Sequence, residues 1–370
     1  MILGILKESQ QDNRVSLLPE HITTLAENEI TVVIESDAGN RSCFENAKYV
    51  EAGASIDIKE NILNKSDIIL KINPPDENEL MRDKIYVGVF NPLWNIDLIK
   101  KFRELNITSF SLDLIPRSTR AQAMDILSSM AMIAGYKAVL EAANKLPNFF
   151  PMFMSASGTI KPAKVLVLGA GVAGLQALAT ARKLGAVVEV FDVHTAVKEE
   201  VMSLGGKFVE VEVAKNDISA GGYAVEQTEE FKVRQQELIH AHTIKASVII
   251  CTAQIPGKKA PLLIKKETVE EMQPGSVIID MAAGSGGNCE LSRVDETVIH
   301  NWVKIIGKAN FPSKMPADAS KMLGKNLVNF LNLLITEDKK LNLDFNDEII
   351  AATCLTHNNK IVSKSLTKII

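Results

Sequence analysis

The chain has 370 residues, of which 46% are apolar and 23% are charged, so it is too long for one compact core and too apolar to stay disordered. Its net charge of -4, with 41 basic against 45 acidic residues and no long basic run, argues against nucleic acid as a partner. No uninterrupted apolar run approaches the roughly 20 residues of a membrane-spanning helix, and the start lacks the basic and apolar regions of a signal peptide.

The N-terminal third of the sequence alternates short β-branched runs with helix-like periodic runs. This is the rhythm of βαβ units, which build a parallel sheet. The predicted strands are residues 2–6, 30–35, 67–72, 86–90 and 107–112, and the predicted helices are 20–29, 44–52 and 96–105. None of the turns after these strands carries a glycine-rich phosphate loop.

Residues 117–145 are rich in Ala, Met and Leu and contain no proline, which predicts one long helix between two lobes. A second βαβ series begins at residue 164. Its strands have the near-continuous apolar character of a sheet that is covered on both faces. They are predicted at residues 165–168, 187–191, 247–252, 276–280 and 303–306.

A last helix, residues 317–334, is expected to return to the first lobe. The sequence therefore predicts an α/β fold of two Rossmann-like lobes with parallel sheets. The first lobe would comprise residues 1–132 and 314–370, and the second would comprise residues 133–313.

The strongest motif is the run Gly169-Ala170-Gly171-Val172-Ala173-Gly174, which follows a predicted strand and opens a predicted helix. In such a turn the first glycine allows the tight bend, the second lets a pyrophosphate approach the backbone, and the third permits close helix packing. Asp192 ends the next strand, where a carboxylate accepts hydrogen bonds from an adenosine ribose and repels a 2′-phosphate. The pattern predicts an NAD site; the alternative is a glycine-rich turn in an empty sheet, with Asp192 as a helix cap.

A polar row lies in the otherwise apolar run 117–129. If this segment is helical, Gln122, Asp125 and Ser129 share one face, with Ser128 beside them. Spacing alone leaves two interpretations open: a row of functional side chains, or a helix N-cap with a solvated stripe.

Other polar groups carry less specific signals. Lys7, Arg14 and Lys71 could bind a carboxylate substrate, although surface charges or structural ion pairs are the preferred interpretation. The four cysteines are far apart and show no metal-ligand spacing, which favours reduced structural thiols and no metal site. Residues 216–230 form a long polar insertion, a kind of loop that is often mobile or functional.

Taken together, these residues resemble the superfamily of alanine dehydrogenases and proton-translocating nicotinamide nucleotide transhydrogenases. The likeness covers nearly the whole chain. It rests on Lys7-Glu8, Arg14-Val15, Pro19-Glu20, the Gly169 to Gly174 turn, Lys207, Ile255-Pro256-Gly257, the run from Met272 to Asp280, and Gly286-Gly287-Asn288-Cys289.

Within this superfamily the sequence favours the transhydrogenase branch. Alanine dehydrogenases carry a catalytic His in the segment that matches residues 90–94, and an Asp where this chain has Gly284; both are missing here. The run Arg120 to Ala131, with Arg117 before it and Gly135-Tyr136 after it, is similar to the transhydrogenase alpha-subunit signature. Ala220-Gly221-Gly222-Tyr223-Ala224 matches the mobile loop of the NAD(H)-binding component.

The resemblance implies the NAD(H)-binding subunit of a split, proton-translocating transhydrogenase that transfers a hydride directly from NADH to NADP(H) sites on a partner subunit. It also implies membrane-spanning partner subunits, a peripheral cytoplasmic location at the inner membrane, and a homodimer. The implied catalytic residues are Arg117, Gln122, Asp125, Ser128 and Tyr223. The implied NAD(H)-binding residues are Gly169, Gly171, Val172, Gly174, Asp192, Val193, His194, Gly222, Gln235 and Gln254.

Two departures and two alternatives accompany this interpretation. Relatives often have Arg at the position of His194 and an acidic residue at that of Gly284. One alternative function is a self-sufficient dehydrogenase of an amino or imino acid, with Arg14 and Lys71 holding the carboxylate. The other is a non-catalytic NAD-binding module.

Overall fold

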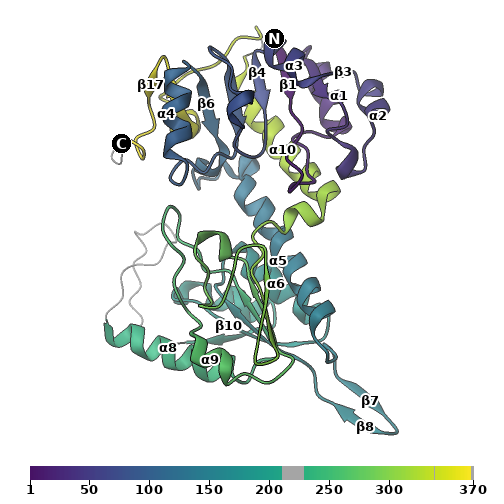
Figure 1. Cartoon of the computed structure of the whole chain (residues 1–370), viewed down its shortest axis with the longest axis vertical. Helices are drawn as coiled ribbons and strands as arrows, with labels where there is room; N and C mark the ends of the chain where they lie inside the picture. Colours follow the sequence, from purple (N-terminus) through teal and green to yellow (C-terminus); the bar gives the residue numbers. More distant parts are fainter. Residues whose placement is uncertain (211–228, 337, 368–370) are drawn as a thin grey trace. The chain divides into compact units, whose positions relative to one another are not determined.

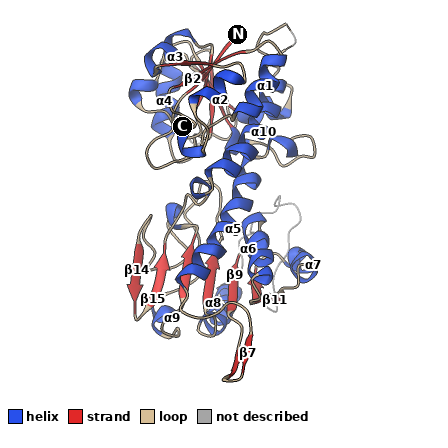
Figure 2. Cartoon of the chain, turned by 90° about the vertical axis from the view of Figure 1, so that its right-hand side faces the viewer, coloured by secondary structure: helices blue, strands red, loops and turns tan. Residues whose placement is uncertain are grey.

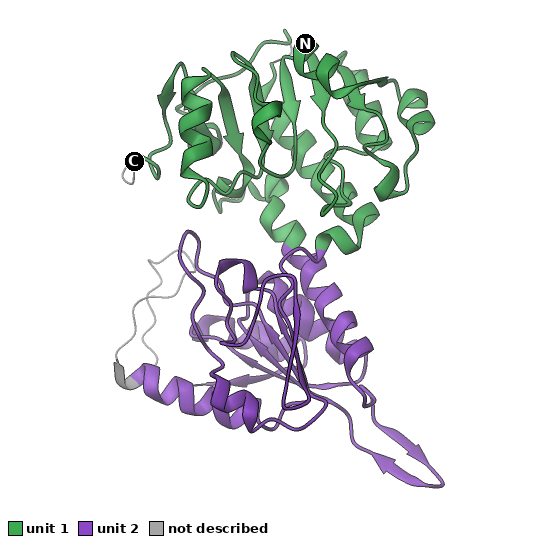
Figure 3. Cartoon of the chain, viewed as in Figure 1, with its two compact units in different colours: residues 1–130, 312–370 green, residues 131–311 purple. Residues whose placement is uncertain are grey.

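A computed structural model describes residues 1–210, 229–336 and 338–367 of the chain (Figure 1). Contacts divide it into unit 1, residues 1–130 and 312–370, and unit 2, residues 131–311 (Figure 3). The sequence places these boundaries after residues 132 and 313, and in the structure they follow residues 130 and 311. Each unit is built around its own sheet, which confirms the predicted α/β class with two Rossmann-like lobes.

The sheet of unit 1 has the strand order β17-β16-β6-β5-β4-β1-β2-β3. Strands β1 to β6 are parallel, whereas β16 and β17 extend the edge in antiparallel pairing. The strands are β1 (Ile2–Ile5), β2 (Thr31–Glu35), β3 (Ser55–Asp57), β4 (Ile68–Leu70), β5 (Ile85–Gly88), β6 (Thr108–Ser111), β16 (Cys354–His357) and β17 (Lys360–Ile361).

Alternate residues of each strand in unit 1 enter different cores, as the period of two requires. One face packs with α1 and α10 around Leu3, Ile5 and Phe110, and the other packs with α3 and α4 around Ile69 and Tyr86. The helices of this unit are α1 (Pro19–Glu27), α2 (Asn46–Glu51), α3 (Lys59–Lys65), α4 (Ile96–Glu104), α10 (Pro316–Leu334) and α11 (Glu348–Thr353).

The main sheet of unit 2 has the order β11-β10-β9-β12-β13-β15-β14, in which only β14 among the described strands is antiparallel. The order reverses between β9 and β12, and such switch points form the crevice that binds ligands in open parallel sheets. The strands are β9 (Lys164–Leu168), β10 (Val187–Phe191), β11 (Lys207–Val209), β12 (Val248–Cys251), β13 (Val277–Asp280), β14 (Thr297–His300) and β15 (Val303–Ile306).

Helices cover both faces of this sheet (Figure 2). Val167 and Ile250 belong to a core with α5, α6 and α7, while Leu168 and Ile249 belong to the opposite core with α8 and α9. This explains the uninterrupted apolar runs of its strands. The helices are α5 (Ile126–Lys145), α6 (Val172–Lys183), α7 (Lys198–Ser203), α8 (Glu229–Thr243) and α9 (Lys266–Glu270).

Helix α5 has the length and mean hydropathy of a membrane-crossing helix, which the broken apolar runs of the sequence do not suggest. Core helices of soluble proteins share these properties. Its residues Ala138, Val139 and Ala142 are buried in the core of unit 2, so α5 packs as a core helix.

A two-stranded hairpin of β7 (Phe153–Ser155) and β8 (Gly158–Ile160) extends from unit 2, away from the main sheet (Figure 1). Phe153, Met154 and Ile160 are exposed, Met154 at 73%. The hairpin therefore presents an apolar surface that the described part of unit 2 does not cover.

The prediction of one helix over residues 117–145 is wrong. The segment contains a short 3-10 turn, η4 (Gln122–Met124), and α5 begins only at Ile126. Asp125 lies between them with φ -74° and ψ 89°, outside the helical region. Gln122 consequently does not share a helix face with Ser129.

Candidate functional site

The turn after β9 has the backbone that its first glycine was predicted to allow. Gly169 has φ +106°, a conformation that other residues rarely adopt. A Cβ atom at this position would lie 2.5 Å from Thr252 Oγ1, so a side chain is excluded by space as well. The turn thus requires glycine for two separate reasons.

The other two glycines of the motif differ in what surrounds them. A Cβ atom on Gly174 would lie 1.8 Å from the carbonyl oxygen of Gly169, so α6 packs directly on the turn. A Cβ atom on Gly171 would meet nothing within 4 Å. Gly171 is the N-cap of α6, where the helix dipole and the first amide groups favour an anion. The open space at Gly171 therefore fits a phosphate group.

Asp192 lies at the end of β10 and is tied to this turn. Its Oδ2 atom accepts a hydrogen bond from the amide of Ala170 at 2.6 Å, and its Oδ1 atom accepts from the amide and the Nδ1 atom of His194, both at 2.9 Å. Burial opposes ionisation, but the bonds from His194 and Ala170 outweigh it and hold the pKa of Asp192 below its usual range. The site therefore presents a negative charge at neutral pH.

A carboxylate offers about four lone pairs, and the described residues use three of those on Asp192. The Oδ2 atom can accept a further hydrogen bond, for example from a hydroxyl group. The ionised carboxylate would repel a second anion.

The remaining predicted NAD(H)-binding residues of unit 2 fall at several places. Val172 opens α6 and is 39% exposed, and Val193 packs beside the core under α8. Gln254 follows β12, and its Nε2 atom donates to the carbonyl of Met281 at 3.1 Å. Gln235 is half-buried on α8. Gly222 and Tyr223 lie outside the described residues.

The structure adds three residues that the sequence motifs did not single out for a role. Thr252 donates to the carbonyl of Gly169, and Asn288 bonds the backbone of Ala253. Asp280 is fully buried and accepts from the amide of Asn288. A strand-end Asp and a Gly-Gly-Asn run are visible in the sequence, but nothing in their spacing reveals this partnership.

In unit 1, the predicted catalytic residues of the segment 117–128 surround the start of α5. Asp125 caps the helix: its Oδ1 atom accepts from the amide of Ser128 at 2.9 Å, and its Oδ2 atom accepts from Ser128 Oγ at 2.5 Å. Arg117 and Gln122 are exposed, while Asp125 and Ser128 are half-buried. The N-cap interpretation thus describes Asp125, and it also fixes the orientation of Ser128.

The C-terminal part of the chain holds this segment in place. Arg120 pairs with Asp347, and Ser118 donates to Glu348 Oε1 at 2.6 Å. Asn326 and Asn329 of α10 both donate to the carbonyl of Ala123, at 2.8 and 2.9 Å. The turn that presents Gln122 is therefore anchored on both sides.

The switch point of unit 1, between β1 and β4, is filled by the chain's own charged groups. Asp12 binds Arg14 through both carboxylate oxygens, and although burial opposes ionisation, these bonds lower the pKa of Asp12 to about 2. Lys71 and Glu79 form a buried ion pair, at 4% and 1% exposure. Arg14 and Lys71 are therefore structural ion-pair partners, as the preferred sequence interpretation expects.

Glu8 is the unusual group of this cluster. Its carboxylate accepts from the amide of Ile72 at 2.6 Å and from Asn73 Nδ2 at 2.9 Å. Burial nevertheless raises the pKa of Glu8 to about 7, because these bonds and the Lys71 charge only partly compensate for lost hydration. Glu8 therefore changes charge near neutral pH.

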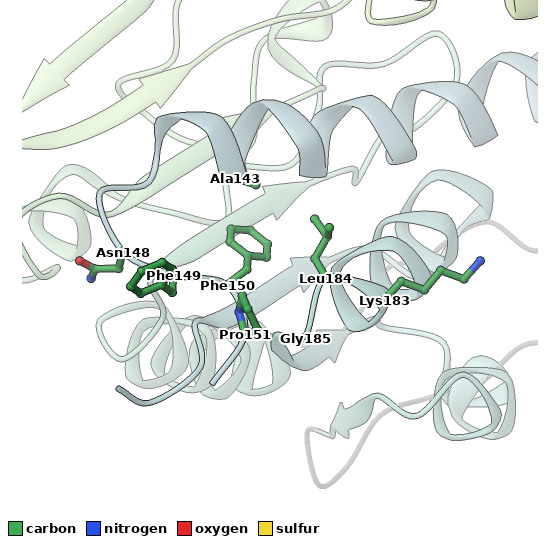
Figure 4. A pocket seen from close by; sticks show the side chains of 8 residues that line it. All are labelled: Ala143, Asn148, Phe149, Phe150, Pro151, Lys183, Leu184 and Gly185. Atoms are coloured by element: carbon green, nitrogen blue, oxygen red, sulfur yellow. The ribbon is translucent and has the colours of Figure 1, made fainter. Parts of the chain in front are cut away.

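A cavity of about 590 Å³ lies at the other end of α6, beside the base of the hairpin (Figure 4). Phe149, Phe150, Pro151 and Leu184 give it an apolar lining. Its residues belong to the opposite end of α6 from Gly171, so this cavity is not part of the glycine-turn site.

Metal-ligating side chains do not gather among the described residues, which contain no group of three or more His, Cys, Asp or Glu suited to a metal ion. The four cysteines are free thiols. Burial raises the pKa of Cys289 to about 11 and that of Cys354 to about 12, which makes both thiols unreactive.

Comparisons with known proteins cover nearly the whole chain. Residues 4–134 match the family described as alanine dehydrogenase/PNT, N-terminal domain, and residues 138–364 match the corresponding C-terminal domain. The chain is 42% identical to the first of the chains that make up the NAD(P) transhydrogenase alpha subunit of Rhodospirillum rubrum, covering 99% of each sequence. It is also 42% identical to NAD(P) transhydrogenase subunit alpha of Haemophilus influenzae, covering 97% of this chain and 71% of that one.

Among solved structures, the chain is similar to a transhydrogenase from Sinorhizobium meliloti. The TM-score is 0.89 at 38% identity, and the alignment covers 98% of this chain and 100% of the other. The likeness therefore includes both units and the turn between β9 and α6.

Proposed function

Because this chain belongs to the alanine dehydrogenase/PNT family, and within it to the alpha subunits of NAD(P) transhydrogenases, we propose that it binds NADH and passes a hydride to NADP+ held by a partner subunit. The observation that carries this proposal is the turn at residues 169–174 joined to Asp192. The turn leaves open space at Gly171, and Asp192 supplies an anionic acceptor.

The same observation supports NAD(H) rather than NADP(H) on this chain. The ribose hydroxyls of NAD(H) can donate to Asp192 Oδ2, whereas the 2′-phosphate of NADP(H) would meet an ionised carboxylate. Val172, Val193, His194, Gln235 and Gln254 would line the rest of the groove, together with Gly222 on the loop outside the described residues. In this proposal the NADP(H) site belongs to the partner subunit.

Hydride transfer between two nicotinamide rings requires no general acid, so the protein contributes by positioning and by excluding water. NADH would supply the hydride. We assign Gln122, which is exposed, to contacts with the partner's nucleotide, and Arg117, Asp125 and Ser128 to the nicotinamide end. The Asp125–Ser128 hydrogen bonds support this assignment because they give Ser128 one orientation. Tyr223 would close over the site.

The ion pairs of unit 1 count against the dehydrogenase alternative. Arg14 and Lys71, the two cations that could hold a carboxylate substrate, already carry Asp12 and Glu79 as partners. The segment 90–94, Phe-Asn-Pro-Leu-Trp, also offers no His for proton transfer.

The assembly that we propose contains NADP(H)-binding and membrane-spanning subunits that couple the reaction to proton translocation. This chain would lie at the cytoplasmic side of the inner membrane and attach through those subunits. We also propose that it forms a homodimer. The exposed apolar hairpin supports this, because a two-stranded hairpin is marginally stable alone in water, and a second copy would cover it.

The decisive experiment is stopped-flow hydride transfer from NADH to thio-NADP+, with the purified chain and an NADP-binding transhydrogenase subunit. Rapid transfer that needs both proteins is the expected result. NADH binding without transfer would point to a non-catalytic binding module. Oxidation of NADH by the chain alone with pyruvate and ammonia would point to the dehydrogenase.

A further inference from the structure

Three loops of unit 2 leave the carboxyl edge of its parallel sheet side by side, because β9, β12 and β13 are neighbours. They are the glycine turn that begins at Gly169, the loop 252–261 and the loop 281–292. The side chains that join these loops form a continuous chain of hydrogen bonds.

Asn288 is the centre of this chain. It is fully buried, and its Oδ1 atom accepts from the amide of Ala253 at 3.1 Å. Its Nδ2 atom donates to the carbonyl of Ala253 at 2.9 Å and to that of Pro261 at 2.8 Å. One carboxamide thus satisfies both backbone groups of Ala253 and closes the loop 252–261. Only a side chain with one acceptor and two donors can do this.

Asp280 fixes Asn288 in turn. Its Oδ2 atom accepts from the amides of Asn288 and Cys289, at 2.8 and 3.0 Å, and from Ser292 Oγ at 2.6 Å. Gly287, at φ +78°, lets the loop bend so closely that a Cβ atom there would lie 3.0 Å from the Asp280 carboxylate. The Gly-Gly-Asn run is therefore the device that brings Asn288 onto the end of β13.

The other end of the chain touches the glycine turn. Thr252 Oγ1 donates to the carbonyls of Leu168 and Gly169, at 3.1 Å to each. A Cβ atom on Gly169 would lie 3.3 Å from the amide nitrogen of Ala253, the residue that Asn288 grips. The position of the turn against β12 therefore depends on Thr252 and Asn288 together.

We propose that Asn288 and Thr252 are positioning residues of the dinucleotide site, which hold the glycine turn in the place where it receives a pyrophosphate. This inference rests on the proposed binding of NADH. Neither residue needs to touch the nucleotide. Small displacements of a binding backbone reduce affinity strongly, so loss of either tie weakens ligands that carry a pyrophosphate.

The test measures dissociation constants for NADH, ADP-ribose and adenosine by titration calorimetry. Asn288→Asp keeps the shape but replaces two donors with an acceptor, and Thr252→Val removes only the hydroxyl. We expect both variants to bind NADH and ADP-ribose about tenfold more weakly, the effect of about one lost hydrogen bond, and to bind adenosine almost normally. Thr252→Ser, which restores the hydroxyl, should restore the affinity.

A control variant separates positioning from general destabilisation. Val248 is fully buried at the other end of β12, so Val248→Ala lowers the thermal midpoint of unfolding without touching the loops. It should bind all three ligands as the unaltered chain does. Equal loss of affinity in Val248→Ala would overturn the proposal.

The remaining outcomes are also decisive. Unchanged NADH affinity in a folded Asn288→Asp protein would overturn the inference while leaving the proposed function intact. If Asn288→Asp does not fold, the comparison of Thr252→Val with Thr252→Ser decides in the same way. Absence of NADH binding by the unaltered chain would instead overturn the proposed function, and the inference with it.

Discussion

The backbone amide of Ala170 donates to Asp192 Oδ2 across 2.6 Å, so the turn after β9 and the end of β10 form one unit. The charge of Asp192 is thereby held at a fixed place beside the N-terminus of α6. This relationship predicts that cofactor choice and cofactor affinity depend on the same carboxylate.

Asp192→Asn should reduce the preference for NADH over NADPH. The amide keeps the shape of the side chain but loses the charge that repels a 2′-phosphate, and its nitrogen cannot accept from Ala170. We expect the ratio of the NADPH and NADH dissociation constants to fall by about tenfold or more. Fluorescence titration with both nucleotides measures this ratio, and an unchanged ratio would contradict the role of Asp192.

Gly171→Ala and Gly174→Ala should separate binding from stability. A methyl group on Gly171 meets nothing within 4 Å and suits its φ of -70°, so the thermal midpoint should stay within the range of about 0.5 kcal/mol typical of surface changes. NADH affinity should fall, because the methyl group occupies the approach to the turn. A methyl group on Gly174 collides with Gly169 and should cost about 1–3 kcal/mol of stability. Normal NADH binding by Gly171→Ala would argue against a phosphate site there.

Gln122→Ala should slow hydride transfer and leave NADH binding unchanged. Gln122 is exposed at the turn before α5, so its loss costs little stability. Stopped-flow transfer in the reconstituted complex, next to an NADH titration of the same protein, gives both quantities. Thr119→Ala, another exposed position in this segment, is the control. Transfer at the unaltered rate in Gln122→Ala would remove Gln122 from the site.

Glu8 should make unit 1 less stable as the pH rises. Its pKa is about 7 in the folded chain against an ordinary value of 4.5, so between these values the folded state binds more protons than the unfolded state. The stabilisation is complete below pH 4.5 and is lost as the pH rises through 7, a change of about 3 kcal/mol in the free energy of unfolding.

Glu8→Gln removes this group, so the difference in stability between variant and unaltered chain should change across that pH window. Chemical unfolding followed by fluorescence measures it. Trp94 belongs to unit 1 and Trp302 to unit 2, so a Trp302→Phe background reports on unit 1 alone. A constant difference from pH 5 to 8 would show that Glu8 titrates outside this range.

Met154→Glu should weaken self-association. Met154 is 73% exposed on the hairpin, so a charge there costs the monomer little, whereas burial in a dimer interface would leave the charge without water. Sedimentation velocity should show a shift from dimer to monomer. Val50→Glu, at an exposed apolar position in unit 1, should leave the association state unchanged. A persistent dimer in Met154→Glu would exclude the hairpin from the interface.

The sequence was sufficient for the parallel parts of both sheets. Strands β10 and β15 have their predicted bounds, and α10 begins only one residue before its predicted start at residue 317. Buried strands and long amphipathic helices declare themselves through the period and continuity of their apolar residues. The glycine turn was equally legible, because Gly169 and Gly174 are needed for reasons of local space.

The sequence was not sufficient where a structure depends on a distant partner. Strand β16 is paired with β6, far earlier in the chain, and β14 and the hairpin β7–β8 are short edge elements without a buried apolar run. The helix predicted from residue 117 starts only after Asp125, because the side chain of Asp125 bonds the Ser128 amide in place of a helical turn.

The sequence by itself determined the α/β class, the family and the place of the dinucleotide turn, since these depend on local periodicity and on glycines with fixed local tasks. Tertiary structure alone decided which charges are available for chemistry. It paired Arg14 with Asp12 and Lys71 with Glu79, and it buried Asp280 and Asn288 as a brace for the loops. The physical reason is that hydrogen bonds and ion pairs depend on distances of about 3 Å, which only the folded chain fixes.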